Sequence, residues 1–113
     1  ILKIWKYHEG IDLIASKGTD VLATGDGVIS LRVRSNKGYG NRIVIDHLNG
    51  YKTVYAHLNG FNVNIGDTIS NGDVIGFVGT SGLSTGDHLH YEVLLDNKTI
   101  DPEELIFTSH TQS

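Results

Sequence analysis

Cysteine and methionine are absent from this sequence, and it contains one proline. Without cysteine there can be no disulfide and no thiolate ligand, so any metal ion must be bound by His, Asp or Glu. Basic residues are also few, 9 against 13 acidic ones, which gives a net charge of −4. Partners such as nucleic acid or anionic membrane require clustered Lys and Arg, so we expect no nucleic-acid partner. No apolar run is long enough to span a membrane.

Glycine is abundant, with 14 residues in a chain of 113. So many glycines predict tight turns between short strands, and the length suits one domain with a modest core. We therefore expect an all-β fold, an antiparallel β-sandwich or open barrel. Residues 1–7 are predicted to form a lead-in arm, 8–107 the domain and 108–113 a polar tail. Capping signals predict one short helical turn at 101–107, and the apolar start indicates a domain of a longer precursor.

The most informative segment is the strand predicted at residues 88–95. His88, His90 and Glu92 alternate there with apolar residues, a period-two pattern typical of a half-buried strand. Side chains two positions apart point the same way, about 6.6 Å apart at the backbone. Two such imidazoles can share one metal ion, or one can bind metal while the other transfers protons. The alternative is two solvated histidines, and the pair alone does not decide.

A second segment, from His8 to Asp12, carries another imidazole and a carboxylate. Fully extended, these two residues would lie about 13 Å apart, too far to share an ion. A bend at Gly10 or a helical turn must bring them together, and Gly10 with Ile11 disfavours the helix. A helical His-Glu-x-x-His zinc motif is excluded because position 12 is Asp. The alternative is an ordinary polar loop.

The clearest strand pair covers residues 41–47 and 51–57, because an Asn-Gly step between them is a strong hairpin signal. It places His57 at the end of the returning strand. Residues 18–29 predict strand, turn and strand, and we expect Asp67 and Asp73 to be turn carboxylates. The glycine-rich run 63–79 also suggests a biotinyl-type carrier, but no lysine lies between Lys52 and Lys98 to carry the cofactor.

Ligands without sulfur suit a catalytic zinc held by three protein groups, with water in the fourth position. Two imidazoles and one carboxylate leave the ion enough positive charge to lower the pKa of bound water toward about 7. Remaining histidines could then orient the hydroxide and stabilise the intermediate of amide hydrolysis. Chemistry alone does not say which histidines are ligands. The candidates in the folded part are His8, Asp12, His47, His57, His88 and His90.

Four motifs in order resemble the lysostaphin/LytM-type zinc endopeptidases, over about residues 8–102. The resemblance implies an all-β fold whose central antiparallel sheet carries the metal in a groove. It also implies cleavage of peptide bonds in the stems or cross-bridges of bacterial peptidoglycan, and a place in the cell envelope, periplasmic, wall-bound or secreted. The motifs are His8-x-Gly10-x-Asp12, Tyr39-Gly40-Asn41, Tyr55-Ala56-His57-Leu58 and Ser84-Thr85-Gly86-x-His88-x-His90-x-Glu92.

The same resemblance assigns roles to five residues. It implies one Zn²⁺ per chain, with His8, Asp12 and His90 as its ligands. It implies that His57 and His88 are the non-ligand histidines that activate water and stabilise the oxyanion. All five positions hold competent residues.

Three further residues have roles that the four motifs do not fix. Glu92 could accept a hydrogen bond from an imidazole as a second-shell partner, or it could be a solvated strand carboxylate. His47 matches no catalytic position, and we expect a structural or second-shell histidine at a strand end. Asp87 stands where the family usually has proline, which could raise the pKa of a neighbouring histidine or loosen the loop.

The main alternative function is a non-catalytic LytM-like regulator that binds and activates other wall hydrolases. Such a protein is expected to lack one or more of the five site residues, and none is missing here. The sequence does not indicate whether a glycine bridge or a D-amino-acid cross-link is cut. It also leaves open the oligomeric state and whether an upstream segment of the precursor covers the groove.

Overall fold

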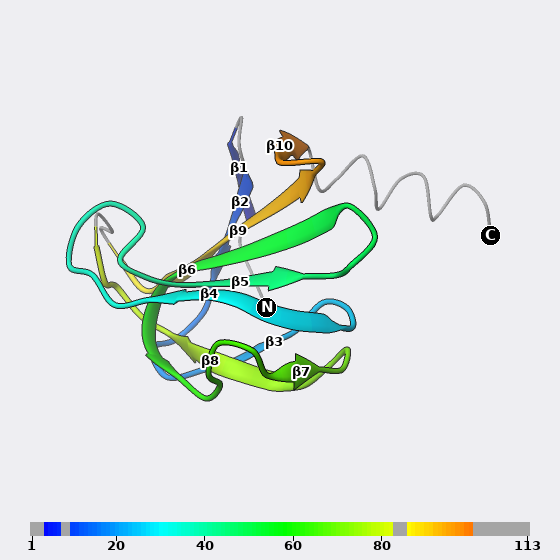
Figure 1. The fold of residues 1–113 in the computed structure, drawn as a ribbon. Coiled ribbons are helices and arrows are strands. Elements are labelled where there is room, and N and C mark those ends of the chain that lie inside the picture. Colours follow the sequence, from blue (N-terminus) through cyan, green and yellow to red (C-terminus); the bar gives the residue numbers. More distant parts are fainter. Residues whose placement is uncertain (1–3, 8–9, 83–85, 101–113) are drawn as a thin grey trace.

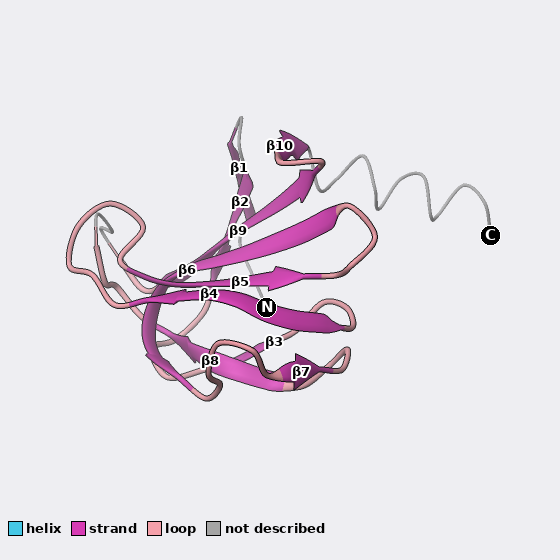
Figure 2. Ribbon diagram, viewed as in Figure 1, coloured by secondary structure: helices cyan, strands magenta, loops and turns pink. Residues whose placement is uncertain are grey.

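The structure, a computed structural model, describes residues 4–7, 10–82 and 86–100, and every regular element in these ranges is a β-strand (Figures 1 and 2). None of these residues forms a helix that could cross a membrane. The strands are β1 (Ile4–Tyr7), β2 (Gly10–Ile14), β3 (Asp20–Leu22), β4 (Gly27–Val33), β5 (Asn41–Asp46), β6 (Tyr51–Phe61), β7 (Thr68–Ile69), β8 (Val74–Val78), β9 (His88–Leu95) and β10 (Lys98–Ile100).

All strand pairs are antiparallel, and they form one sheet in the order β1-β2-β9-β6-β5-β4-β7, with β10 on β9 and β3 on β8. The long strand β6 pairs with β5 and β9 along its first part and with β8 from Leu58 to Phe61. It thereby carries the sheet from one layer into the other (Figure 1). The prediction of an all-β antiparallel fold is confirmed.

The core lies between the two layers. In β5, Ile43 and Ile45 are fully buried on the core side, whereas Arg42 and Val44 lie on the other side and are half-buried. The register Val44–Val54–Glu92 across β5, β6 and β9 continues this second surface, which we call the outer face. The main buried cluster consists of Val21, Ala23, Ile29, Ile43, Ile45, Tyr55, Leu58, Val63, Ile69, Ile75 and Val78.

The turns predicted at Asp67 and Asp73 are present, whereas β3 and β4 do not pair with each other as a simple hairpin would. Asp67 and Asp73 accept hydrogen bonds from the amides of Asn64 and Ser70, at 2.8 and 2.9 Å, as turn carboxylates do. Strands β3 and β4 form where expected, but β3 pairs with β8 and β4 with β5 and β7. The bend at 24–26 therefore connects the two layers.

Of the predicted lead-in arm, the structure describes residues 4–7, which form β1 and pair with β2. The predicted helical turn at 101–107 and the tail at 108–113 lie outside the described residues.

Candidate active site

The centre of the candidate site is the place where β2 and β6 flank β9. Asp12 of β2 pairs directly with His90 of β9, and His90 pairs on its other side with Ala56 of β6. Directly paired residues share a face and bring their side chains within contact distance. The backbone register therefore brings together a carboxylate and an imidazole that are 78 positions apart in the sequence.

The carboxylate of Asp12 contacts both histidines of the predicted pair. Its Oδ1 lies 2.7 Å from His90 Nδ1, and its Oδ2 lies 3.3 Å from His88 Nε2. The His88 and His90 side chains are 12% and 14% exposed, which excludes the alternative of two solvated histidines. At its other nitrogen, His88 Nδ1 lies 2.8 Å from the Gly86 carbonyl oxygen and can donate to it.

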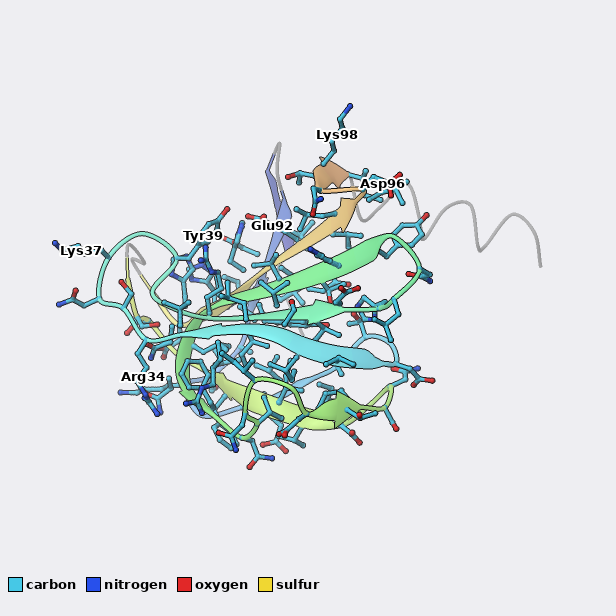
Figure 3. The ribbon with its side chains drawn as sticks, viewed as in Figure 1. Arg34, Lys37, Tyr39, Glu92, Asp96 and Lys98 are labelled. Carbon is cyan, nitrogen blue, oxygen red and sulfur yellow. The ribbon has the colours of Figure 1, made fainter. Side chains whose placement is uncertain are left out.

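Glu92 holds the far side of the His90 ring. Its Oε2 lies 2.7 Å from His90 Nε2 and accepts a second hydrogen bond, also 2.7 Å, from the Tyr39 hydroxyl. Figure 3 shows Tyr39 and Glu92 beside one another above the sheet. Glu92 is only 5% exposed, so it is not a solvated strand carboxylate.

The electrostatics of this pair favour positive charge between the two carboxylates. Burial alone would lower the pKa of His90, but the hydrogen bonds and charges of Glu92 and Asp12 outweigh burial and raise it. Burial alone would raise the pKa of Glu92, but the hydrogen bonds from His90 and Tyr39, with the charges of His90 and Arg42, lower it. The His90 position is thus suited to a cation.

His57 approaches the same point from β6. Its ring centroid lies 5.0 Å from that of His88 and 6.0 Å from that of His90. Nδ1 lies 2.7 Å from the carbonyl oxygen of Ser81, to which it donates, so the lone pair is on Nε2. Burial lowers the pKa of His57 despite this hydrogen bond. The ring is therefore neutral, and able to accept a proton, below the pH at which a free histidine becomes charged.

The prediction that His57 ends its strand is wrong, because β6 continues to Phe61. His57 instead lies within β6 at a φ of 61°, next to a register shift against β5. Its amide donates to the Tyr39 carbonyl at 2.8 Å. A bulge of this kind re-aims a side chain, and here it directs His57 to the site.

The loops at 35–41 and 79–82 support His57, and this part was not foreseen from the sequence. The Ser81 hydroxyl donates to the Leu58 carbonyl at 2.7 Å and accepts from the Asn41 amide at 2.9 Å. The Asn41 side-chain amide also donates to Leu58 O at 2.9 Å. Gly40, at a φ of 66°, lets the two loops touch, because a Cβ there would overlap the Ser81 backbone. The Tyr39-Gly40-Asn41 motif was the sequence signal from which this support of His57 could have been predicted.

The bend expected between His8 and Asp12 involves residues 8–9, which lie outside the described residues, and Gly10 has a further part. It is the first residue of β2, and it lies so close to β9 that a Cβ would lie 2.5 Å from the Tyr91 backbone oxygen, 2.9 Å from Glu92 Cγ and 3.2 Å from His90 Cε1. Real Cβ atoms essentially never approach within 3.0 Å. Gly10 is therefore required for the close approach of β2 to the His90 and Glu92 side chains.

His47 does not join the cluster, and its predicted second-shell role finds no support. Its Nδ1 lies 2.7 Å from Asp26 O and its Nε2 2.8 Å from Thr53 Oγ1. Thr53 pairs with Val93, one position away from Glu92, so it projects to the opposite side of the sheet. There His47 lines an open cavity of about 730 Å³ with Thr24, Tyr51, Tyr91 and other residues. The contacts of His47 are those of a structural histidine.

The described residues supply two of the three predicted zinc ligands. His8 lies outside them, and among residues 10–82 and 86–100 no group of three or more His, Asp or Glu is arranged to hold a metal ion. Asp12 and His90 nevertheless fit a zinc site. A carboxylate oxygen and an imidazole nitrogen converge, and the other nitrogen of the ring is held by Glu92, as is usual for metal-binding histidines.

Comparison with known proteins places this geometry in context. Residues 6–102 match the model of peptidase family M23. Over 102 residues the chain is 48% identical to the DD-carboxypeptidase/endopeptidase Mpg of Neisseria meningitidis serogroup B, covering 90% of this chain and 23% of that protein. Over 94 residues it is 40% identical to the peptidoglycan DD-endopeptidase ShyB of Vibrio cholerae, covering 83% and 22%. The chain thus spans about a quarter of the length of these curated relatives.

Solved structures share the fold at comparable identity. The catalytic domain of lysostaphin from Staphylococcus simulans matches with a TM-score of 0.81 and 34% identity, over 88% of this chain and 78% of that one. A zinc-containing peptidase from Vibrio cholerae matches with a TM-score of 0.80 and 38% identity, over 83% and 29%.

Proposed function

Because the chain belongs to peptidase family M23, we propose that it is a zinc-dependent endopeptidase that hydrolyses peptide bonds of bacterial peptidoglycan. One observation carries this proposal. Asp12, His57, His88 and His90 come from three strands and converge on one point of the outer face, although only His88 and His90 are neighbours in sequence. A fold without chemistry at this point would not need to bury so many titratable groups together.

The proposed ligand set for one zinc ion is His8, Asp12 and His90. When bound, zinc supplies Lewis-acid polarisation of the scissile carbonyl and a lowered pKa for water. Asp12 contributes an anionic oxygen, and His90 contributes Nδ1. Glu92 accepts the hydrogen bond of His90 Nε2, which fixes the tautomer with its lone pair on Nδ1.

His57 and His88 move protons in this proposal. Each ring has Nδ1 within 2.8 Å of a backbone carbonyl, to which it can donate, and this leaves Nε2 as the atom that faces the reaction. The attacking water loses a proton to a neutral imidazole while its oxygen bonds to the carbonyl carbon. The imidazolium so formed stabilises the negative carbonyl oxygen and then protonates the leaving amine as the C–N bond breaks.

Two classes of substitution test this assignment. Ala at His57 or His88 should abolish digestion of purified peptidoglycan while one zinc per chain remains by elemental analysis. Ala at Asp12 or His90 should remove the zinc together with the activity. His47→Ala is the matched control, and it should retain both, since His47 lies on the other side of the sheet. Undiminished digestion by the His57 or His88 variants would refute the roles proposed here. A zinc-free, inactive wild-type protein would point to the regulator instead.

The substrate and the location are part of the same proposal. The relatives Mpg and ShyB are named for DD-peptidase activity, which supports a bond between D-amino acids rather than a glycine bridge. Because peptidoglycan lies in the cell envelope, the proposed location of the protein is the cell envelope. Mass spectrometry of fragments released from a D-amino-acid cross-linked and a glycine-bridged peptidoglycan would distinguish the two.

A further inference from the structure

Arg42 is a cation beside the candidate site. It lies on the outer face of β5, and its guanidinium carbon is 5.0 Å from the centre of the Tyr39 ring. The same Tyr39 hydrogen-bonds Glu92, and its ring centre lies 5.8 Å from that of His90. Arg42 and the candidate metal ligand His90 thus both lie near the Tyr39 ring.

The guanidinium is incompletely satisfied by the part of the chain that the structure describes. Its Nε is buried and has no hydrogen-bond partner there, and no carboxylate among the described residues forms an ion pair with Arg42. Glu92 is already engaged by His90 and Tyr39. A buried polar group without a partner is costly and rare in native proteins, so each one calls for an explanation such as a functional role or a bound ion.

We propose that Arg42 binds a carboxylate of the peptide substrate and selects stems that carry one beside the scissile bond. This inference rests on the function proposed above. The guanidinium presents its donors in a planar fork that matches a carboxylate, and the Tyr39 ring supports it from one side. Arg42 lies 5.0 Å from the Tyr39 ring centre, which lies 5.8 Å from that of His90, so the guanidinium is at most about 11 Å from the His90 ring. A peptide extends by roughly 3.5 Å per residue, so the carboxylate belongs within about three residues of the cleaved bond.

Two sources of that carboxylate share this chemistry, the free C-terminus of a stem and the side chain of an acidic residue within it. The test uses zinc-loaded protein and three forms of one D-amino-acid-containing peptide. They are the free acid, the C-terminal amide and the side-chain amide. We expect one of the two amides to be cleaved with a kcat/KM about tenfold or more below that of the acid, because a charge-assisted hydrogen-bond pair is lost. The amide that is affected identifies the source.

Arg42→Gln should abolish this discrimination by lowering cleavage of the acid to that of the affected amide. Arg42→Lys should keep a smaller preference, because it retains the charge and loses the fork. Arg34→Gln is the matched control. Arg34 stacks on Phe61 at 4.9 Å, much as Arg42 does on Tyr39, but Figure 3 shows it well apart from Tyr39 and Glu92. The control changes net charge equally and should keep the wild-type preference.

Binding separates recognition from chemistry. In the His57→Ala background, which should not cleave, calorimetry should show the same loss of affinity for the affected amide, and Arg42→Gln should erase the difference. Equal cleavage of all three forms by the wild-type protein would overturn the inference while leaving the peptidase function intact. So would an Arg42→Gln protein that is slower on every form but still prefers the acid, because Arg42 would then only position Tyr39. Cleavage of no form would overturn the proposed function, and this inference with it.

Discussion

The hydrogen bond between Glu92 and His90 gives the sharpest test of the proposed zinc site. Replacing Glu92 with Gln keeps the shape of the side chain and removes its charge. The residue is 5% exposed and accepts two hydrogen bonds of 2.7 Å, from His90 Nε2 and from the Tyr39 hydroxyl. Both bonds go to Oε2, so an amide oxygen in the same place can still accept them, and the main loss is the negative charge.

The size of the effect follows from the lost charge. A hydrogen bond to a charged group contributes about 1.5–3 kcal/mol, and each 1.4 kcal/mol is about a factor of ten in a binding constant. We therefore expect Glu92→Gln to weaken zinc binding by about 10- to 100-fold, which is also the usual range for an outer partner of a metal-binding histidine.

The assay is competition for zinc against a chromophoric chelator. Asp96→Asn is the matched control, because it removes the same charge from an exposed turn at the end of β9, well away from Glu92 (Figure 3). It should bind zinc as the wild-type protein does. Equal zinc affinity of the two variants would show that Glu92 does not orient His90.

Three further results are expected. Gly10→Ala should lower the free energy of unfolding by about 1–3 kcal/mol in urea titrations, because its Cβ would overlap the Tyr91 backbone oxygen and Glu92. Gly86→Ala, whose Cβ would meet open space, should leave the free energy of unfolding unchanged. Burial lowers the pKa of His57, so the acidic limb of kcat/KM against pH should have an apparent pKa below the 6.5 of free histidine. An apparent pKa above 6.5 would argue against His57 as the base. Ser81→Ala removes two hydrogen bonds of the loop that supports His57. It should lower the free energy of unfolding by about 1–3 kcal/mol and reduce activity. Ser70→Ala, which changes an exposed side chain, should change neither quantity.

Local patterns in the sequence predicted the elements well. The alternation in residues 88–95 predicts β9, and the Asn-Gly step predicts the β5–β6 hairpin, because both depend only on neighbouring residues. The alternation also placed His88, His90 and Glu92 on one face, as the contacts of Asp12 and His90 require.

Contacts between distant segments could not be predicted in this way. Strand β3 pairs with β8, and the Ser81 carbonyl accepts a hydrogen bond from the His57 ring. Each contact joins segments more than 20 residues apart. No local propensity specifies them, since they depend on which surfaces pack in the finished fold. The sequence predicts a bend near Gly10, but it does not predict the close approach to β9 that requires glycine there, because that approach depends on how the two strands pair.

His57 shows why the site depends on an irregular strand. Tyr55 and Leu58 are fully buried in the core, and Ala56 pairs with His90 on the outer face. In a regular strand His57 would follow Tyr55 into the core and Leu58 would point to the site. The bulge at His57, with its φ of 61°, inserts one residue into the alternation and corrects both positions.

A left-handed backbone at a non-glycine residue costs about 1–3 kcal/mol and persists only where its surroundings enforce it. The Tyr39 carbonyl binds the His57 amide, and the Ser81 carbonyl binds the ring. The two loops that bring these carbonyls meet at Gly40 and Gly82, both at positive φ and too close for any side chain. The histidine that we propose transfers protons is therefore held by backbone groups, while Asp12 and His90, the proposed ligand pair, are held by strand register. Changes in the loops should impair catalysis before they impair metal binding.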